Sequence, residues 1–295
     1  MAKVLVTGGA GFIGSELVRQ LAQNDDRVIV VDNLVNGKKE NLAGLPKDRV
    51  TLAVADVRGT ARMRGLLKGV DRVFHLACLG VRHSIHSPVE NHSVNAEGTL
   101  SLLIEARRAN VKRFVYVSSS EVYGTGKRVP MDEDHRTYPM TVYGASKLAG
   151  ECYARAFHET YGFATVVVRP FNAFGPRCHH EGDSGEVIPK FMLRSMAGKP
   201  MIVFGDGTQT RDFTYVEDTA RGIIWPARAP RPWARRSTSG RAARSRSRRW
   251  PARSPASSIG RSRSPTSRRG RATFCASTPI LERPASSLAL SRASA

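Results

Sequence analysis

VLVTGGAGFIGS, residues 4–15, is the stretch that decides how this chain folds. Its apolar beginning is typical of a short buried strand, and apolar residues then recur at helical spacing at Ile13, Leu17 and Leu21. Gly8, Gly11 and Gly14 therefore lie on a strand-to-helix turn. Glycines let the backbone approach a pyrophosphate closely, and the free N–H groups of a helix N-terminus attract its negative charge. The stretch predicts a phosphate-binding turn for a dinucleotide.

A second strand, expected over residues 28–32, ends in Asp32, which stands 18 residues after Gly14. An acid at this place accepts hydrogen bonds from the ribose hydroxyls of adenosine and repels a 2′-phosphate. The glycine spacing, Gly-x-x-Gly-x-x-Gly, is one residue longer than the common fingerprint, so a glycine-rich turn without a ligand is the alternative. The acid at the end of the strand favours nucleotide binding, and NAD over NADP.

Strands and helices alternate through the first 170 residues. A helix opening at Pro88 has a predicted apolar stripe, and a second long helix is expected over residues 141–160. The stripe contains Leu100, Leu103 and Ile104, and further strands are expected at residues 50–57, 70–77, 114–117 and 164–169. This alternation predicts an α/β fold: a doubly wound parallel sheet of the Rossmann type, with helices on both faces. Ligands of such sheets bind beyond the carboxyl ends of the strands.

The pattern loosens after Pro170. The elements expected there are a helix over residues 187–197, a strand over 201–204, a turn over 205–209 and a helix from Val216. They predict a smaller lobe beside the sheet. The expected domains are therefore 1–170 for the cofactor, 171–225 for an incomplete substrate lobe, and 226–295 for a tail.

The tail differs in composition from everything before it. The 295-residue chain has a net charge of +21, of which the tail supplies +16 through 17 Arg, no Lys and one acid, Glu282. With 15 Ser and almost no apolar periodicity, it is expected to be disordered. It is either a genuine arm that binds nucleic acid through phosphates or an out-of-frame translation of a GC-rich gene. The loss of lysine at Trp225-Pro226, inside an expected helix, favours the second origin.

Cysteine usage and hydropathy bear on the cellular compartment. No apolar run is long enough for a membrane span, and the first strand begins at Lys3, too early for a signal peptide. The four cysteines are far apart, as is typical of reduced thiols, at Cys78, Cys152, Cys178 and Cys275. We expect a cytoplasmic protein without a membrane anchor. His83, His86 and the segment 178–181 lack further ligands at metal spacing, so no metal site is predicted.

Tyr143 and Lys147 stand at i and i+4, on one face of the expected helix. A free phenol has a pKa of about 10, which is too high for a base at neutral pH. A nearby ammonium and an oxidised nicotinamide ring both favour the phenolate, so the pair makes Tyr143 a usable base. The serines at 118–120 follow the preceding strand, where a hydroxyl can bond the oxygen being oxidised. They disfavour the alternative, an ordinary helix that carries Tyr and Lys.

These motifs together resemble the extended short-chain dehydrogenase/reductases, and among them the NAD-dependent sugar-nucleotide epimerases and dehydratases. The matching segments run in family order from residue 1 to about 224: Thr7–Gly14, Asp32–Leu34, Asp56-Val57, His75–Ala77, Val94-Asn95, Ser118–Gly124, Tyr143–Lys147, Arg169–Asn172 and Gln209–Phe213. The resemblance implies a Rossmann domain that holds NAD and a C-terminal lobe that holds a nucleotide-diphosphate sugar. It also implies a homodimer formed through the helices expected at 88–109 and 141–160.

The resemblance implies roles for individual residues as well. Tyr143 is the implied base, Lys147 binds the nicotinamide ribose, and Ser119 or Ser120 bonds the sugar hydroxyl. The substrate is faced by Arg82, Asn172 and Arg211, with Arg211 on the diphosphate. The residues implied to hold NAD are Gly8, Gly11, Phe12, Ile13, Gly14, Asp32, Asn33, Asp56, Val57, Leu76, Ala77, Asn95, Tyr143 and Lys147.

Two reactions share the first step that the resemblance implies, oxidation at sugar C4. Epimerases return the hydride to the other face of the sugar, whereas dehydratases also remove the C5 proton and expel water from C6. The stretch Gly80–Ser84 before Pro88 is similar to that of 4-epimerases, which favours a UDP-hexose 4-epimerase. Glu121, in Ser120–Gly124, is similar to the acid/base of 4,6-dehydratases or a related decarboxylase, and a structural carboxylate is its other interpretation. The alternative of another class is an inactive remnant whose tail binds nucleic acid.

Overall fold

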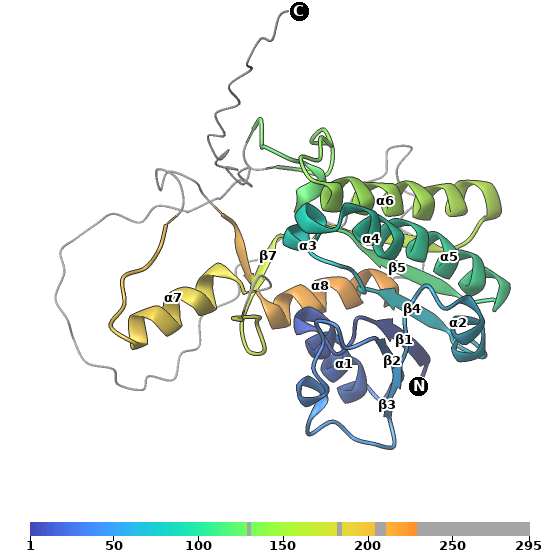
Figure 1. Ribbon diagram of the computed structural model, residues 1–295. Coiled ribbons are helices and arrows are strands. Elements are labelled where there is room, and N and C mark those ends of the chain that lie inside the picture. The colour runs from blue at the N-terminus through green and yellow to red at the C-terminus, as the bar shows by residue number, and fades with distance from the viewer. Residues whose placement is uncertain (129–130, 182–184, 204–210, 229–295) are drawn as a thin grey trace, which may run out of the picture.

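The computed structural model describes residues 1–128, 131–181, 185–203 and 211–228. Its centre is a six-stranded sheet in the order β3-β2-β1-β4-β5-β6, in which all neighbouring strands are parallel (Figure 1). The strands are β1 (Lys3–Thr7), β2 (Arg27–Asp32), β3 (Val50–Val54), β4 (Arg72–His75), β5 (Arg113–Val117) and β6 (Thr165–Val168). The prediction of a doubly wound parallel sheet is confirmed.

Helices connect the strands and follow them. They are α1 (Phe12–Gln23), α2 (Thr60–Leu66), α3 (Val81–His86), α4 (Pro88–His92), α5 (Gly98–Arg108), α6 (Val142–Tyr161), α7 (Val187–Met196) and α8 (Val216–Arg228), with the 3-10 turns η1 (Lys39–Leu42) and η3 (Ser120–Val122). Segment η2 (Ser93–Glu97), between α4 and α5, is a π-helical turn. Helix α6 begins where the Thr141 hydroxyl accepts the N–H of Gly144, and it ends at Gly162 with a left-handed φ of 64°.

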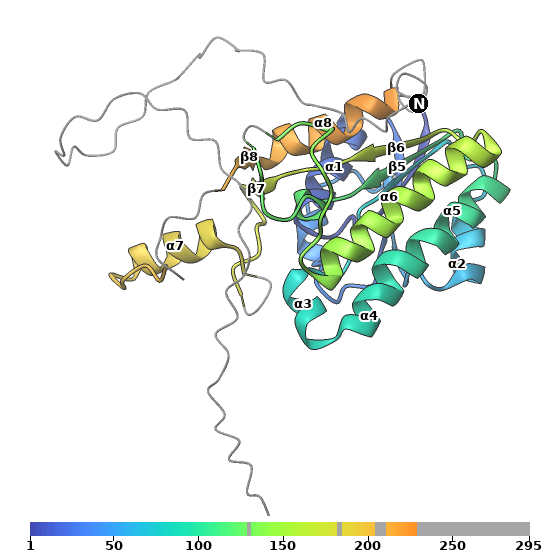
Figure 2. The ribbon, with the colours of Figure 1, turned by 90° about the horizontal axis from the view of Figure 1, so that it is seen from above.

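Both faces of the sheet are covered because its strands carry apolar residues on both sides. Helices α1 and α8 lie on one face, where Val4 and Ile223 belong to one core cluster. Helices α2, α5 and α6 lie on the other face, around Leu5 and Tyr116. Figure 2 shows these two helix layers on either side of the strands. The carboxyl ends of the strands are therefore the edge at which a ligand site can form.

Two expectations for this part of the chain are wrong in detail. Strand β3 ends at Val54 instead of residue 57, because the next residues turn back: the N–H of Gly59 donates to the carbonyl of Asp56. In α5 the buried face contains Leu102, Leu103 and Ala106, whereas Ile104 is exposed. The predicted stripe lies wholly within α5, which turns the face of Leu102 and Ala106, rather than that of Ile104, toward the sheet.

A second, smaller unit follows β6. Strands β7 (Asn172–Phe174) and β8 (Phe213–Tyr215) form a separate parallel pair, and neither was expected from the sequence. Helix α7 matches the expected helix, but the strand predicted at 201–204 is not found over residues 201–203. Residue 204 and the turn predicted at 205–209 lie outside the described residues.

Helix α8 continues through Pro226 to Arg228, so Trp225-Pro226 lies inside the helix that was expected from Val216. Packing against the sheet outweighs the loss of one N–H donor, since Ile224 and Ala227 are buried in the core that α1 shares. Arg113 also donates to the carbonyl of Pro226 at 3.1 Å. One face of α8 thus belongs to the core of the large sheet, through Ala220, Ile223, Ile224 and Ala227. The domain boundaries stay predictions, and residues 229–295 lie outside the part that the structure describes.

Two features of the described residues bear on the class of protein. Within those ranges, no helix is long and apolar enough to cross a membrane. Nor do three or more His, Cys, Asp or Glu side chains gather there in a way that could hold a metal ion. In the described part of the chain His83 lies 3.1 Å from Glu90, and Cys78, Cys152 and Cys178 are free thiols.

Candidate active site

The glycine turn between β1 and α1 is closely packed. Gly8 has a φ of 69°, and a Cβ on it would lie 2.7 Å from the backbone nitrogen of Ala77. A Cβ on Gly14 would lie 2.0 Å from the carbonyl oxygen of Gly8. Helix α1 begins after Gly11, and no described side chain caps its first N–H groups. These N–H groups are left for an anion, which fits a pyrophosphate.

Asp32 lies at the carboxyl end of β2, beside this turn. One carboxylate oxygen accepts the N–H of Ala10 and the other accepts the N–H of Leu34, each at 2.9 Å. A Cβ on Gly37 would lie 2.6 Å from Asp32 Oδ1, so the loop passes close to the carboxylate. Each carboxylate oxygen keeps a further lone pair for a ribose hydroxyl. Asp32 therefore holds the turn and fits the predicted ribose contact.

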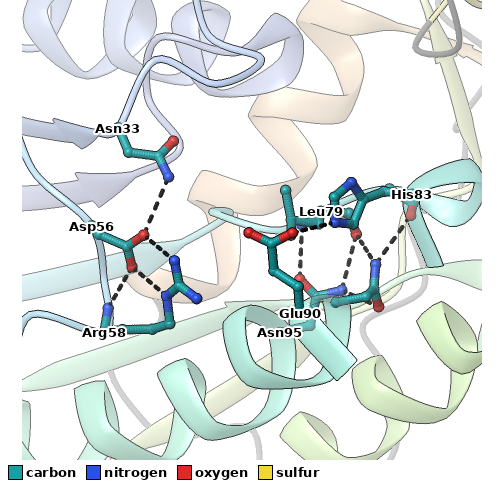
Figure 3. Close-up of polar contacts among 9 residues, drawn as sticks. Asn33, Asp56, Arg58, Leu79, His83, Glu90 and Asn95 are labelled. Atoms are coloured by element: carbon teal, nitrogen blue, oxygen red, sulfur yellow. Dashed lines mark hydrogen bonds and ion pairs between the residues drawn. The ribbon is translucent and has the colours of Figure 1, made fainter. Parts of the chain in front are cut away.

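A polar rim follows at the end of β3 (Figure 3). Asp56 receives two hydrogen bonds from the guanidinium of Arg58, at 3.0 and 2.8 Å, and one from Asn33 at 3.4 Å. The Arg58 hydrogen bond is the main reason that the pKa of Asp56 is lowered. Val57 turns inward and packs with Leu79. Asn33 and Asp56, both predicted to contact NAD, are thus brought together.

Asn95 is buried and holds the segment after β4 (Figure 3). Its amide accepts the N–H of Leu79 at 2.8 Å and donates to the Leu79 carbonyl at 2.9 Å. The same amide donates to Ser146 on α6 at 3.2 Å. The backbone of Leu76 and Ala77 is held from β1, since their N–H groups donate to the carbonyl and hydroxyl oxygens of Thr7. Asn95 therefore shapes the wall of the site, and a direct contact with NAD stays a prediction.

His75, the last residue of β4, is a structural residue. Its two ring nitrogens lie 2.6 Å from the Thr7 hydroxyl and 2.9 Å from the Thr99 hydroxyl. Complete burial, together with the charge of Lys147, lowers its pKa to about 3. The imidazole is neutral at physiological pH and ties β1, β4 and α5 together beneath the site.

Lys147 reaches from α6 to the end of β5. Its ammonium donates to the Val117 carbonyl at 2.7 Å and lies 4.9 Å from the centre of the Tyr116 ring. Burial lowers the pKa of Lys147, and the neighbouring Cys78 and Glu151 oppose that shift. The side chain is therefore a buried cation at the carboxyl end of the sheet.

Tyr143 lies one helical turn before Lys147 and faces three polar groups. Burial, followed by the proximity of Cys78 and Glu121, raises the pKa of the phenol well above its ordinary value. A hydrogen bond with Ser119 opposes that shift. Ser119 itself accepts the N–H of Glu121 at 3.2 Å. The structure thus brings Tyr143 to Ser119, and Tyr143 and Lys147 each lie within electrostatic range of Cys78.

Glu121 lies at the edge of this group. Burial raises the pKa of its carboxyl group, and the positive charge of Arg211 opposes the rise. Arg211, predicted on the substrate, therefore lies within electrostatic range of Glu121. Ser120 is buried, and its N–H donates to the Pro170 carbonyl at 3.1 Å, so of the two serines Ser119 is the one beside the phenol.

The other predicted substrate residues lie further out. Arg82 is exposed on α3, and Asn172 is exposed on β7, where its amide donates to the Asp212 carbonyl at 3.3 Å. Phe12 and Ile13 pack in an apolar cluster at the start of α1 and can offer only backbone groups to a cofactor. Arg82 and Asn172, predicted to bind the substrate, are therefore both accessible to solvent.

Sequence reasoning missed several residues around the site. Cys78 interacts with Tyr143, although nothing in its sequence context indicates this. Glu151, one turn after Lys147, forms a buried double hydrogen bond with Arg169 at 2.8 and 2.6 Å. The spacing of Lys147 and Glu151 at i and i+4 was a usable signal for that acid.

Comparison with known proteins places this geometry. Residues 4–235 match the model of the NAD dependent epimerase/dehydratase family. The UDP-glucose 4-epimerase of Mycolicibacterium smegmatis is 36% identical over 227 residues, which are 75% of this chain and 72% of that protein. The solved UDP-N-acetylglucosamine 4-epimerase of Methanobrevibacter ruminantium M1 is 38% identical with a TM-score of 0.75, over 78% of this chain and 74% of that one. The dTDP-glucose 4,6-dehydratase DesIV of Streptomyces venezuelae, solved with NAD, is 36% identical with a TM-score of 0.73, over 78% and 73%.

Proposed function

The chain belongs to the NAD-dependent epimerase/dehydratase family, and on that premise we propose that it is a UDP-hexose 4-epimerase. It is an enzyme of nucleotide-sugar chemistry with NAD as its cofactor. The choice of epimerase is supported by the 4-epimerases among its relatives and by the Gly80–Ser84 stretch. The single observation that supports the mechanism is that Tyr143 is hydrogen-bonded to Ser119, with the ammonium of Lys147 one helical turn along at the end of β5.

The residues present fit NAD. The uncapped start of α1 and the packed glycines suit the pyrophosphate, and Asp32 suits the adenosine ribose. A 2′-phosphate on that ribose would meet the carboxylate, which favours NAD over NADP. When bound, the cofactor supplies a hydride acceptor for the sugar carbon.

In this proposal Tyr143 takes the proton of the sugar 4-hydroxyl. Without ligand the phenol is protonated, because burial raises its pKa. The buried ammonium of Lys147, one helical turn away, favours the phenolate of Tyr143. The positive charge of an oxidised nicotinamide ring beside the phenol would favour it as well. Ser119 holds the reacting oxygen through its hydroxyl, while Arg211 pairs with the diphosphate.

The test is direct. The full chain is incubated with NAD and UDP-glucose or UDP-galactose, and the sugars are separated by chromatography. Interconversion of the two hexoses is expected. If neither the hexoses nor their N-acetyl forms interconvert, while NAD still binds, the epimerase proposal fails and the family assignment stands.

A second candidate, a 4,6-dehydratase or related decarboxylase, rests on Glu121. Its carboxyl group is shielded from water, with a raised pKa, and it influences Tyr143. These are the properties of a residue that removes and returns a proton. Reaction of a UDP- or dTDP-hexose in deuterated water then yields a 4-keto-6-deoxy sugar labelled at C5, and Glu121→Gln abolishes it. An unlabelled 4-epimer as the sole product assigns Glu121 a structural role.

The homodimer also stays a proposal. Helices α5 and α6 expose Ile104 and Tyr161, and Arg107 lies 4.2 Å from the centre of the Tyr161 ring. This surface supports self-association through the predicted helices. Light scattering after gel filtration should give twice the chain mass, and Ile104→Glu should give the monomer. A cytoplasmic location stays a prediction from the cysteines.

The remnant hypothesis is tested at the level of the gene. The coding DNA downstream of codon 225 is read in its two other frames. A frame that continues α8 and then encodes an Asn-x-Gly-Ser-Gly turn, as family members have, establishes the frameshift. Otherwise the Arg/Ser tail is a genuine arm, and its binding to polyanions should fall steeply with salt.

A further inference from the structure

Arg177 connects the second unit of the chain to the glycine turn. It lies between β7 and α7 with a left-handed φ of 69°. Its Nε donates to the hydroxyl oxygen of Ser15 at 3.2 Å, and an Nη nitrogen forms an ion pair with Glu16. Ser15 and Glu16 follow directly after Gly14, the last glycine of the turn. None of these three residues was predicted to belong to the site.

Glu16 is an acid close to the place where an anion must bind. Its side chain is only 6% exposed, near the N-terminus of α1. A carboxylate there competes with phosphates for the positive end of the helix. It also repels a diphosphate strongly, because a buried charge is poorly screened. An unpaired Glu16 would therefore oppose dinucleotide binding.

The ion pair lies where helix α1, the segment between β7 and α7, and helix α8 meet. The other carboxylate oxygen of Glu16 accepts the amide of Gln20 at 3.0 Å, and that amide also donates to the carbonyl of Glu217 on α8 at 3.0 Å. Beside these bonds, Phe12, Ala173 and Val216 form an apolar cluster with Cys178 packed against it. Arg177 is held over Glu16 by contacts on both sides.

We propose that Arg177 is a positioning residue for the dinucleotide: it neutralises Glu16, so that the N-terminus of α1 can accept a pyrophosphate. Because Arg177 belongs to the second unit, correct docking of that unit and cofactor binding support each other. The proposal rests on NAD as the cofactor, and it is independent of whether the sugar reaction is epimerisation or dehydration.

The test is a set of NAD titrations on the full chain by calorimetry. Arg177→Gln leaves a buried carboxylate unpaired, so NAD affinity should fall about tenfold or more. Glu16→Gln should bind NAD at least as tightly as the unmodified chain. The double variant Glu16→Gln/Arg177→Gln should return to within about threefold of the unmodified chain, because no unpaired acid remains. Adenosine, which has no phosphate, should bind all four proteins equally.

Arg108→Gln is the charge-matched control: it also removes one arginine from a buried acid, Glu105 on α5, which keeps Arg64 as a partner. It should leave NAD affinity unchanged, and Arg177→Lys should keep most of the affinity because the charge remains. The proposal is overturned if the double variant binds as weakly as Arg177→Gln, since Arg177 would then act on the phosphates directly. It is equally overturned if Arg177→Gln binds NAD normally. Should that variant fail to fold, Glu16→Gln decides, and weaker NAD binding there overturns the proposal.

Discussion

Strand β1 and helix α7 are both rich in apolar residues, but β1 buries them and α7 exposes them to solvent. Val4, Leu5 and Val6 of β1 are completely buried, whereas Met192, Leu193 and Met196 of α7 are between 48% and 82% exposed. In Figure 1 and Figure 2 α7 lies apart from the sheet that buries β1. A short amphipathic helix derives its stability mainly from the surface on which it packs. In the described residues, the large sheet thus has a completely buried core, whereas α7 exposes its apolar face to solvent.

The largest expected effect is on turnover, through Tyr143 on helix α6 beside the large sheet. Tyr143→Phe removes the proposed base, so turnover should fall by about a thousandfold or more while NAD affinity changes less than about twofold. Steady-state assays with the accepted sugar nucleotide, together with NAD titration, measure both quantities. Tyr153→Phe, on the same helix, is the control with near-normal turnover. Normal turnover in Tyr143→Phe would remove this residue from the mechanism.

Stability tests the comparison itself. Leu5→Ala opens a cavity in the core and should lower the free energy of unfolding by about 2–5 kcal/mol. Leu193→Ala, the same substitution on α7, should cost less than about 0.5 kcal/mol, because the side chain is half exposed. Urea denaturation of the full chain gives both values. A similar loss in the two variants would mean that something buries α7 in solution.

Cofactor choice should depend on the edge of the sheet rather than on the second unit. Asp32→Ala removes a carboxylate that holds the Ala10 N–H and is proposed to bind the ribose, so NAD affinity should fall about tenfold to a hundredfold. The preference for NAD over NADP should shrink in the same titrations. Asp71→Ala is the control, because Asp71 accepts the N–H of Lys3 at the opposite end of β1. An unchanged NAD preference in Asp32→Ala contradicts the role given to this acid.

The smallest effect is a pH dependence that originates beneath the site. The unfolded chain protonates a histidine near pH 6.5, but buried His75 resists protonation down to about pH 3. Protons therefore favour the unfolded state below pH 6.5, and stability should fall by about 1.4 kcal/mol per pH unit. Glu105, whose pKa the Arg64 hydrogen bond lowers to about 2, contributes only below its ordinary value of 4.5. Urea midpoints between pH 6.5 and 5 should show the slope, and His75→Asn should reduce it.

The fold of the first half was predictable because its signals are local. Glycine spacing, apolar runs and an acid at the end of a strand each act within a few residues, and together they predicted the sheet correctly. The stripe around Ile104 failed because helical spacing alone does not decide which apolar face of a helix packs on the sheet: Leu102 and Ala106 are buried, and Ile104 is exposed. Pro226 is a local helix-breaking signal, yet α8 continues through it because the helix packs on the sheet.

The sequence predicted only those residues of the candidate site that belong to recognisable motifs. Tyr143, Lys147 and Ser119 follow from spacing and order along the chain. Arg177 and Glu16 do not, because an ion pair between residues 161 positions apart is set by how the two units dock. The placement of Glu121 near Arg211 is likewise a tertiary fact. The disorder expected of the tail stays a prediction, since residues 229–295 lie outside the described ranges.

The strand order has a consequence for how the chain is made. Of the six strands of the large sheet, β1 is synthesised first, yet it lies inside the sheet, and its partners β2 and β4 end at residues 32 and 75. A nascent chain leaving the ribosome must therefore carry Val4, Leu5 and Val6 unpaired on one side until β4 has emerged. At about 5–20 residues per second this interval lasts several seconds, during which an apolar segment is open to chaperones and to aggregation. The central position that buries β1 in the folded protein also means that, of the six strands, β1 spends the longest time during translation without its second partner strand.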